Sequence, residues 1–148
     1  MSEPVVIVCE RGGKWANTVA RLLPPGTPIR QTRGMAECDR QLGLAPGSLV
    51  VLEVGHDPLA RTLHWLAELG RRDAVAGVVI VAPAAWQALE WPLREAGAVY
   101  FATSPRALAP VAHAWACQLK RAGRPKGPLV AQIWDALPWR ESAVTLGR

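Results

Sequence analysis

Short apolar runs rich in β-branched residues recur along this chain, and each is followed by a segment whose apolar residues have helical spacing. The runs lie at residues 4–10, 28–33, 49–55, 76–84 and 98–105. Such runs are typical of strands buried on both faces of a parallel sheet, because crossover helices cover both faces. The run at 28–33 is the most polar, and we expect it near a sheet edge.

The segments between these runs predict five helices. Asp57 is placed to cap the third helix. Pro92 should break or restart the fourth helix, within residues 85–98, which would then consist of two short pieces. The second helix is expected at residues 35–44. Apolar residues at helical spacing define the other three: Trp15, Val19, Leu22 and Leu23 for the first, Leu59, Leu63, Leu66 and Leu69 for the third, and Leu108, Val111, Trp115 and Leu119 for the fifth.

Five consecutive strand–helix units with right-handed crossovers leave few topologies open. We expect an α/β fold with a doubly wound, five-stranded parallel sheet in the flavodoxin-like order 2-1-3-4-5 and helices on both faces. The 148 residues suit one such domain, which we place at 1–120. A basic linker at 121–128 and an amphipathic, helical C-terminal tail at 129–148 are expected to follow it.

The charge and cysteine content restrict where this chain works. Residues 118–148 hold six of the 17 basic residues and two of the 12 acidic ones, so the net charge of +5 lies mostly in the linker and tail. The three cysteines have no metal-ligand spacing, the N-terminus does not look like a secretory leader, and no apolar run is long enough to span a membrane. We therefore expect a cytoplasmic protein that contacts no membrane.

A glycine pair with a lysine, Gly12-Gly13-Lys14, follows the first predicted strand. A Walker-type phosphate loop would need Gly at the position of Val8 and Ser or Thr at the position of Trp15, so both requirements fail. No third glycine completes a dinucleotide-binding motif. The glycines are interpreted as a tight turn from strand to helix, with anion binding at the helix N-terminus as the functional alternative.

The stretch REAGAVYFATSP at 94–105 resembles a response-regulator receiver domain, and the resemblance extends over residues 4–120. It implies the positions at which receivers carry out phosphoryl transfer. The phosphoacceptor aspartate corresponds to Glu53. The two acids that hold Mg²⁺ correspond to Cys9 and Glu10. The switch Ser/Thr, the lysine and the switch aromatic correspond to Ala82, Ser104 and either Phe101 or Tyr100.

These substitutions predict a degenerate, or pseudo-, receiver. One carboxylate fewer weakens a Mg²⁺ site, and without the lysine a phosphoryl group has no fixed positive partner. Glu53 also carries its carboxylate one methylene further out than aspartate would. We expect no phosphorylation, no catalytic residue, no metal and no cofactor. The chain is then a non-catalytic signalling or scaffold module that acts by protein–protein interaction.

Seven tryptophans are the most unusual part of the composition. Exposed tryptophan favours interfaces. We expect a protein partner, or a second copy in a homodimer, on the face formed by helix 4, strand 5 and helix 5 at about 86–120. The candidate contact residues are Trp86, Trp91 and Tyr100 on the body and Ile133, Trp134 and Trp139 on the tail, which docks in cis or in trans.

Two other functions stay open at this stage. The first is a small-ligand or phosphate binder at the carboxyl edge of the sheet, around Gly12, Gly13, Lys14, Glu53 and Asp57. The second, ranked below it, is an output factor that grips nucleic acid through the basic linker. A fold of this kind hosts many functions, so the pattern supports the fold further than the function.

Overall fold

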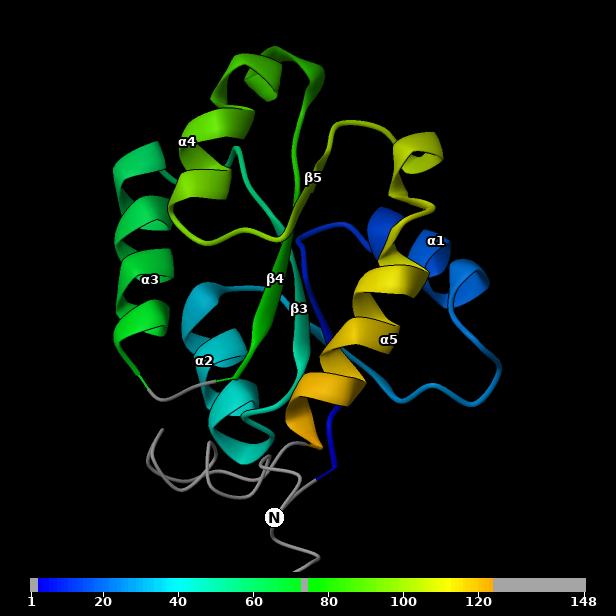
Figure 1. Ribbon diagram of the computed structural model, residues 1–148. Helices are drawn as coiled ribbons and strands as arrows, with labels where there is room; N and C mark the ends of the chain where they lie inside the picture. The colour runs from blue at the N-terminus through cyan, green and yellow to red at the C-terminus, as the bar shows by residue number, and fades with distance from the viewer. Residues whose placement is uncertain (1–2, 73–74, 124–148) are drawn as a thin grey trace, which may run out of the picture.

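The computed structural model describes residues 3–72 and 75–123, which form one parallel sheet between two layers of helices (Figure 1). The strands are β1 (Val6–Cys9), β2 (Ile29–Thr32), β3 (Leu49–Glu53), β4 (Gly77–Val81) and β5 (Tyr100–Ala102). Their order in the sheet is β2-β1-β3-β4-β5, and every pair is parallel. The predicted doubly wound topology is therefore confirmed, with the more polar β2 at one edge.

The helices follow the strands in the expected alternation. They are α1 (Lys14–Leu22), α2 (Met35–Leu44), α3 (Leu59–Arg71), α4 (Glu90–Glu95) and α5 (Val111–Ala122), with short 3-10 helices η1 (Ala84–Leu89) before α4 and η2 (Pro105–Leu108) before α5. The fourth helix is in two pieces that meet between Leu89 and Glu90, and Pro92 lies in the first turn of the second piece, so of the two predicted effects the proline restarts the helix. Within the described residues, none of these helices is both long and apolar enough to cross a membrane.

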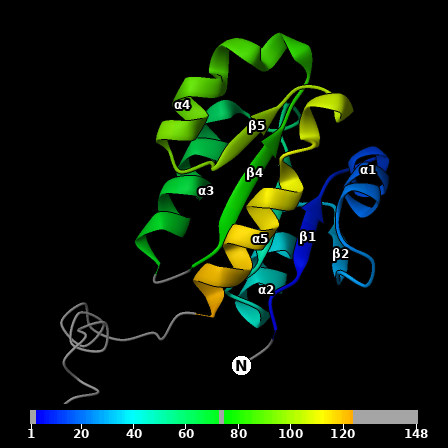
Figure 2. The ribbon, with the colours of Figure 1, turned by 45° about the vertical axis from the view of Figure 1, so that its right-hand side comes forward.

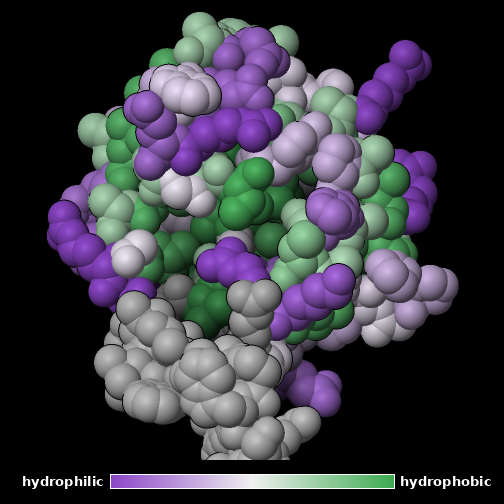
Figure 3. Space-filling model, viewed as in Figure 1, coloured by the Kyte–Doolittle hydropathy of each residue, from purple (hydrophilic) through white to green (hydrophobic). Residues whose placement is uncertain are grey.

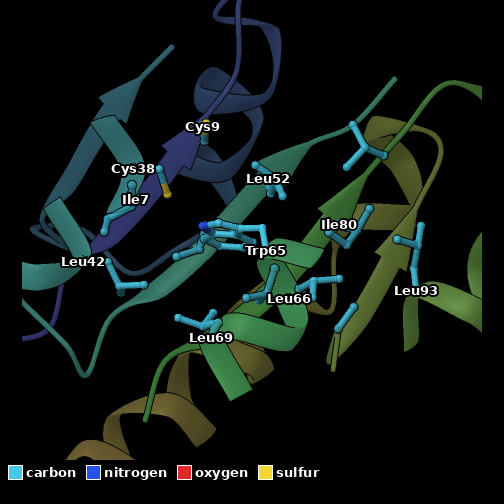
Figure 4. Close-up of a cluster of buried hydrophobic side chains, with 14 of the residues drawn as sticks. Ile7, Cys9, Cys38, Leu42, Leu52, Trp65, Leu66, Leu69, Ile80 and Leu93 are labelled. Carbon is cyan, nitrogen blue, oxygen red and sulfur yellow. The ribbon is translucent and has the colours of Figure 1, made fainter. Parts of the chain in front are cut away.

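Two apolar cores lie on opposite faces of the sheet because successive strand residues point to opposite sides. Helices α1 and α5 cover one face, where Trp15 and Trp115 pack over Val6, Val8 and other strand residues. Helices α2, α3 and α4 cover the other face (Figure 2). Figure 4 shows that second core, with Trp65 and Leu66 of α3 beneath the strands and Cys9 and Cys38 facing it from β1 and α2.

Two details differ from the sequence-based expectations. Asp57 does not cap α3, because its carboxylate accepts a hydrogen bond from the side chain of Arg61 instead. Leu119 is 44% exposed, and Gln118 takes the inward position on α5. The predicted linker and tail at 124–148 lie outside the described residues.

Candidate functional site

The carboxyl ends of the parallel strands meet at one edge of the sheet, where they bring together most of the residues singled out in the sequence. Glu10 directly follows β1, Glu53 ends β3, and Ala82 directly follows β4. A pocket of about 330 Å³ opens at this edge, and Lys14, Glu53, Ala82 and Thr103 belong to its lining. Doubly wound proteins place their functional groups at this edge, so this pocket is the candidate site.

Glu53 is held by three groups of its own chain. The indole N–H of Trp15 donates to one carboxylate oxygen at 3.1 Å. The other oxygen accepts from Nε2 of His56 at 2.9 Å and from the backbone N–H of Arg11 at 3.4 Å. Both oxygens are therefore engaged, and the carboxylate is fixed at the position where the receiver resemblance expects a phosphoacceptor.

Glu10 is almost fully buried, at 5% exposure, and acts as the cap of α1. Its two oxygens accept the backbone N–H groups of Trp15 at 3.2 Å and Ala16 at 2.9 Å. Gly13 has φ +92°, a conformation that favours glycine, and this turn brings the helix N-terminus back over Glu10. Two of the donors that an anion would use at this helix N-terminus, the N–H groups of Trp15 and Ala16, are thus already bound to the carboxylate of Glu10.

The environment of Glu10 raises the pKa of its carboxyl group above the usual value of 4.5. Burial is the largest cause, since it disfavours the charged form. The hydrogen bond from the N–H of Ala16 acts in the opposite direction, and the negative charge of Glu53 raises the pKa further. The two carboxylates at this edge therefore influence each other although each has its own hydrogen-bond partners.

We expect Glu10 to give the protein a measurable pH dependence of stability. The folded protein holds the Glu10 proton more tightly than the unfolded chain does, so this group favours folding at low pH, and the contribution is lost as pH rises from about 4.5 through the folded pKa. Glu10→Gln does not titrate. The difference in unfolding free energy between wild type and Glu10→Gln, measured by urea denaturation across this range, should fall as pH rises. If the difference in unfolding free energy stays constant with pH, the pKa of Glu10 is not raised by folding.

Cys9, which the resemblance matches to the first receiver acid, belongs to the apolar core and does not line this pocket. Its thiol is a hydrogen-bond partner of Cys38, which lowers the pKa of Cys9 to about 7 against the opposing effect of burial. The same hydrogen bond, together with burial, raises the pKa of Cys38. This position offers Mg²⁺ no carboxylate oxygen, the ligand type that the cation prefers.

The residues that the resemblance assigns to the switch positions carry little polar chemistry. Ala82 and Phe101 are buried, and Ser104 is exposed. Lys14 is the lysine in the pocket lining, and its ammonium lies 5.2 Å from the ring centre of Trp15. Tyr100 donates its hydroxyl to the backbone carbonyl of Ala107 at 2.7 Å. Ala82, Phe101, Lys14 and Tyr100 thus each have a packing or hydrogen-bonding contact within the chain.

Sequence reasoning missed the part that Trp15 plays at this edge. Its helical spacing predicted a core residue, and its ring is indeed buried. The indole N–H, however, reaches Glu53, which is 38 positions away in the chain. A buried tryptophan usually finds a hydrogen-bond acceptor, so a tryptophan in the first turn after β1 was the available signal.

The candidate partner-binding residues differ widely in exposure. Trp91 on α4 is 69% exposed, whereas Trp86 and Tyr100 are partly buried and pack against the two cores. The tail residues Ile133, Trp134 and Trp139 lie outside the described residues. On the body, Trp91 is therefore the aromatic side chain that this face offers most openly.

Two solved structures share the fold of this chain over most of its length. A CheY-like protein (tadZ) from Pseudomonas aeruginosa PAO1 aligns over 86% of this chain and all of its own, with a TM-score of 0.55 and 16% identity. The signal receiver domain of the putative response regulator NarL from Mycobacterium tuberculosis aligns over 83% of this chain and all of its own, with a TM-score of 0.55 and 15% identity. No family model matches the sequence, and no curated protein matches it. The chain thus has the flavodoxin-like receiver fold.

Proposed function

We propose that this protein is a non-catalytic, receiver-like signalling module that acts through protein–protein contacts and has no phosphorylation cycle. The observation that carries the proposal is the fixed carboxylate of Glu53. Hydrogen bonds from Trp15, His56 and Arg11 take three of the roughly four acceptor sites of this carboxylate, hold it in one orientation and lower the nucleophilicity of its oxygens, which opposes attack on a phosphoryl group.

The surroundings of Glu53 support the same proposal. Cys9 and Glu10 take the places of the two Mg²⁺-binding acids, and the carboxylate of Glu10 is occupied by the N-terminus of α1. Ser104 has no positive charge with which to neutralise phosphoryl oxygens. Glu53 supplies a constant negative charge, held in one geometry, at the position that corresponds to the phosphorylated aspartate of a receiver. Such a charge suits a module with a single permanent state.

The surface of α4 supports a protein partner on the face that we name α4-β5-α5, within residues 86–120. Trp91 is exposed on α4, and the side chain of Arg94 lies over the ring of Tyr100 at 5.5 Å. Tryptophan, tyrosine and arginine are the residues that most often dominate binding energy at interfaces. A homodimer through this face is the alternative form of the same proposal.

The absence of phosphorylation is tested by incubating the full chain with acetyl phosphate and Mg²⁺ and measuring the intact mass. We expect no mass increase, with a phosphorylatable receiver domain in the same reaction as the positive control. Because the carboxylate of Glu53 is tied to Trp15, a Trp15→Phe variant, which lacks the indole N–H, is tested beside wild type. Stoichiometric labelling of wild type at Glu53 overturns the proposal.

The partner face is tested by affinity capture from the native lysate with matched surface variants. Trp91→Glu should lose the captured protein, and Leu44→Glu, which changes an exposed apolar residue at the end of α2, should keep it. Sedimentation of the purified chain separates a homodimer from a different partner. Equal capture by wild type and Trp91→Glu places the contact elsewhere.

A further inference from the structure

An apolar groove of about 270 Å³ lies at the end of the sheet opposite to Glu53. Leu66 and Leu69 from the last turns of α3, Val78 from the start of β4, and Val99 before β5 belong to its lining, and Arg121 of α5 stands at its side. Figure 3 shows apolar residues gathered on this side of the molecule, between the helices α3 and α5 labelled in Figure 1. The groove is therefore separate from the pocket at the carboxyl edge.

The dimensions and chemistry of the groove suit apolar side chains of a peptide. Leu66, Leu69 and Val78 are buried and form an apolar floor, whereas Val99 is 43% exposed at the rim. The volume lies below the range of about 300–1,000 Å³ that is usual for small-molecule sites. Among the lining residues, only Arg121 has a polar side chain, and the others are apolar or glycine.

The chain itself provides an occupant close to this groove. Arg121 lies two residues before Gly123, where the described part ends, and 25 residues follow at 124–148. Among them, Leu129, Val130, Ile133, Trp134 and Leu137 recur at helical spacing. The six peptide steps from Gly123 to Leu129 span at most about 20 Å, so the apolar segment is tethered within reach of the groove.

We propose that the apolar face of residues 129–137 docks in cis in the groove between α3, β5 and α5. Tethering favours this occupant, because a short linker holds the segment at an effective concentration of the order of millimolar without any further contact. Charge is compatible as well, since Asp135 lies within the segment and Arg121 lines the groove. The proposal goes beyond the signalling function and does not depend on Glu53 or on any partner.

Hydrogen–deuterium exchange of the full chain tests this docking site. Trp134→Asp removes an apolar contact, and Gln132→Asp adds the same charge off the apolar face and serves as the matched control. We expect exchange in peptides from the end of α3 and from residues 96–100 to be roughly tenfold faster in Trp134→Asp, and unchanged in Gln132→Asp. Peptides from β1 in the same molecule serve as the internal standard, so general unfolding is recognised.

A change on the groove side gives an independent readout. Val99→Glu alters an exposed rim residue, so the fold should tolerate it, and it should accelerate exchange in the last turns of α3 as Trp134→Asp does. Protection that increases with protein concentration assigns the groove to the tail of a second copy and overturns docking in cis. Exchange that is the same in wild type, Trp134→Asp and Val99→Glu also overturns it.

Discussion

Replacing Glu10 with alanine is expected to lower the free energy of unfolding by about 2–4 kcal/mol, because it leaves two buried N–H groups without acceptors. The N–H groups of Trp15 and Ala16 begin α1, and Glu10 is their acceptor at 3.2 and 2.9 Å. An unsatisfied buried donor costs about 1–3 kcal/mol. Part of that cost is offset, since the variant no longer buries a carboxylate close to Glu53.

Urea denaturation at neutral pH measures this loss. Glu10→Gln keeps one acceptor oxygen in place and should lose less stability than Glu10→Ala. Lys14→Ala is the control from the same turn, because its side chain is exposed, and it should change stability by no more than about 0.5 kcal/mol. A Glu10→Ala variant as stable as wild type would mean that water satisfies these donors and that the carboxylate does not hold the helix.

The fold was predictable because its signals are local and repeated. Each strand run is bounded by turn residues, and each helix has its own apolar periodicity, so five strand–helix units follow without any knowledge of long-range contacts. The weak run at 28–33 became the edge strand β2, where one side of the strand has no neighbour in the sheet. The right-handedness of the strand–helix–strand crossovers then limits the possible orders of the strands in the sheet.

The site was predictable only in part because its contacts join residues that are far apart. The resemblance located Glu10 and Glu53 but gave no reason to expect Glu10 to cap α1, since a cap normally lies at the residue directly before the helix. Asp57 matched that local rule and nevertheless pairs with Arg61. The Trp15–Glu53 hydrogen bond depends on the packing of α1 against the sheet, which no sequence pattern records.

Helix α5 shows a second limit of sequence patterns. With 3.6 residues per turn, positions three and four after Trp115 both lie beside it on the helix surface. Hydrophobicity favoured Leu119 as the inward residue, but Leu119 is 44% exposed and Gln118 is 2% exposed. The choice is decided by backbone carbonyls at the end of the sheet, which need a donor that leucine does not have.

Replacing Gln118 with leucine is therefore expected to destabilise the protein by about 2–4 kcal/mol, although it makes α5 more hydrophobic. The side-chain amide of Gln118 donates to the carbonyl of Gly47 at 2.9 Å and to that of Val75 at 2.7 Å. These two residues precede β3 and β4, so one amide ties α5 to both central strands. Leucine has a similar size but leaves both carbonyls without this donor.

The mirror substitution Leu119→Gln distinguishes this explanation from a general effect of polarity on α5. Leu119 is exposed, so a polar side chain there should change the free energy of unfolding by no more than about 0.5 kcal/mol in the same urea denaturation. If Gln118→Leu proves neutral and Leu119→Gln destabilising, the apolar stripe governs the helix and the amide contacts contribute little. The expected order is the reverse, because an unsatisfied carbonyl at the buried position costs more than a lost methyl contact at an exposed one.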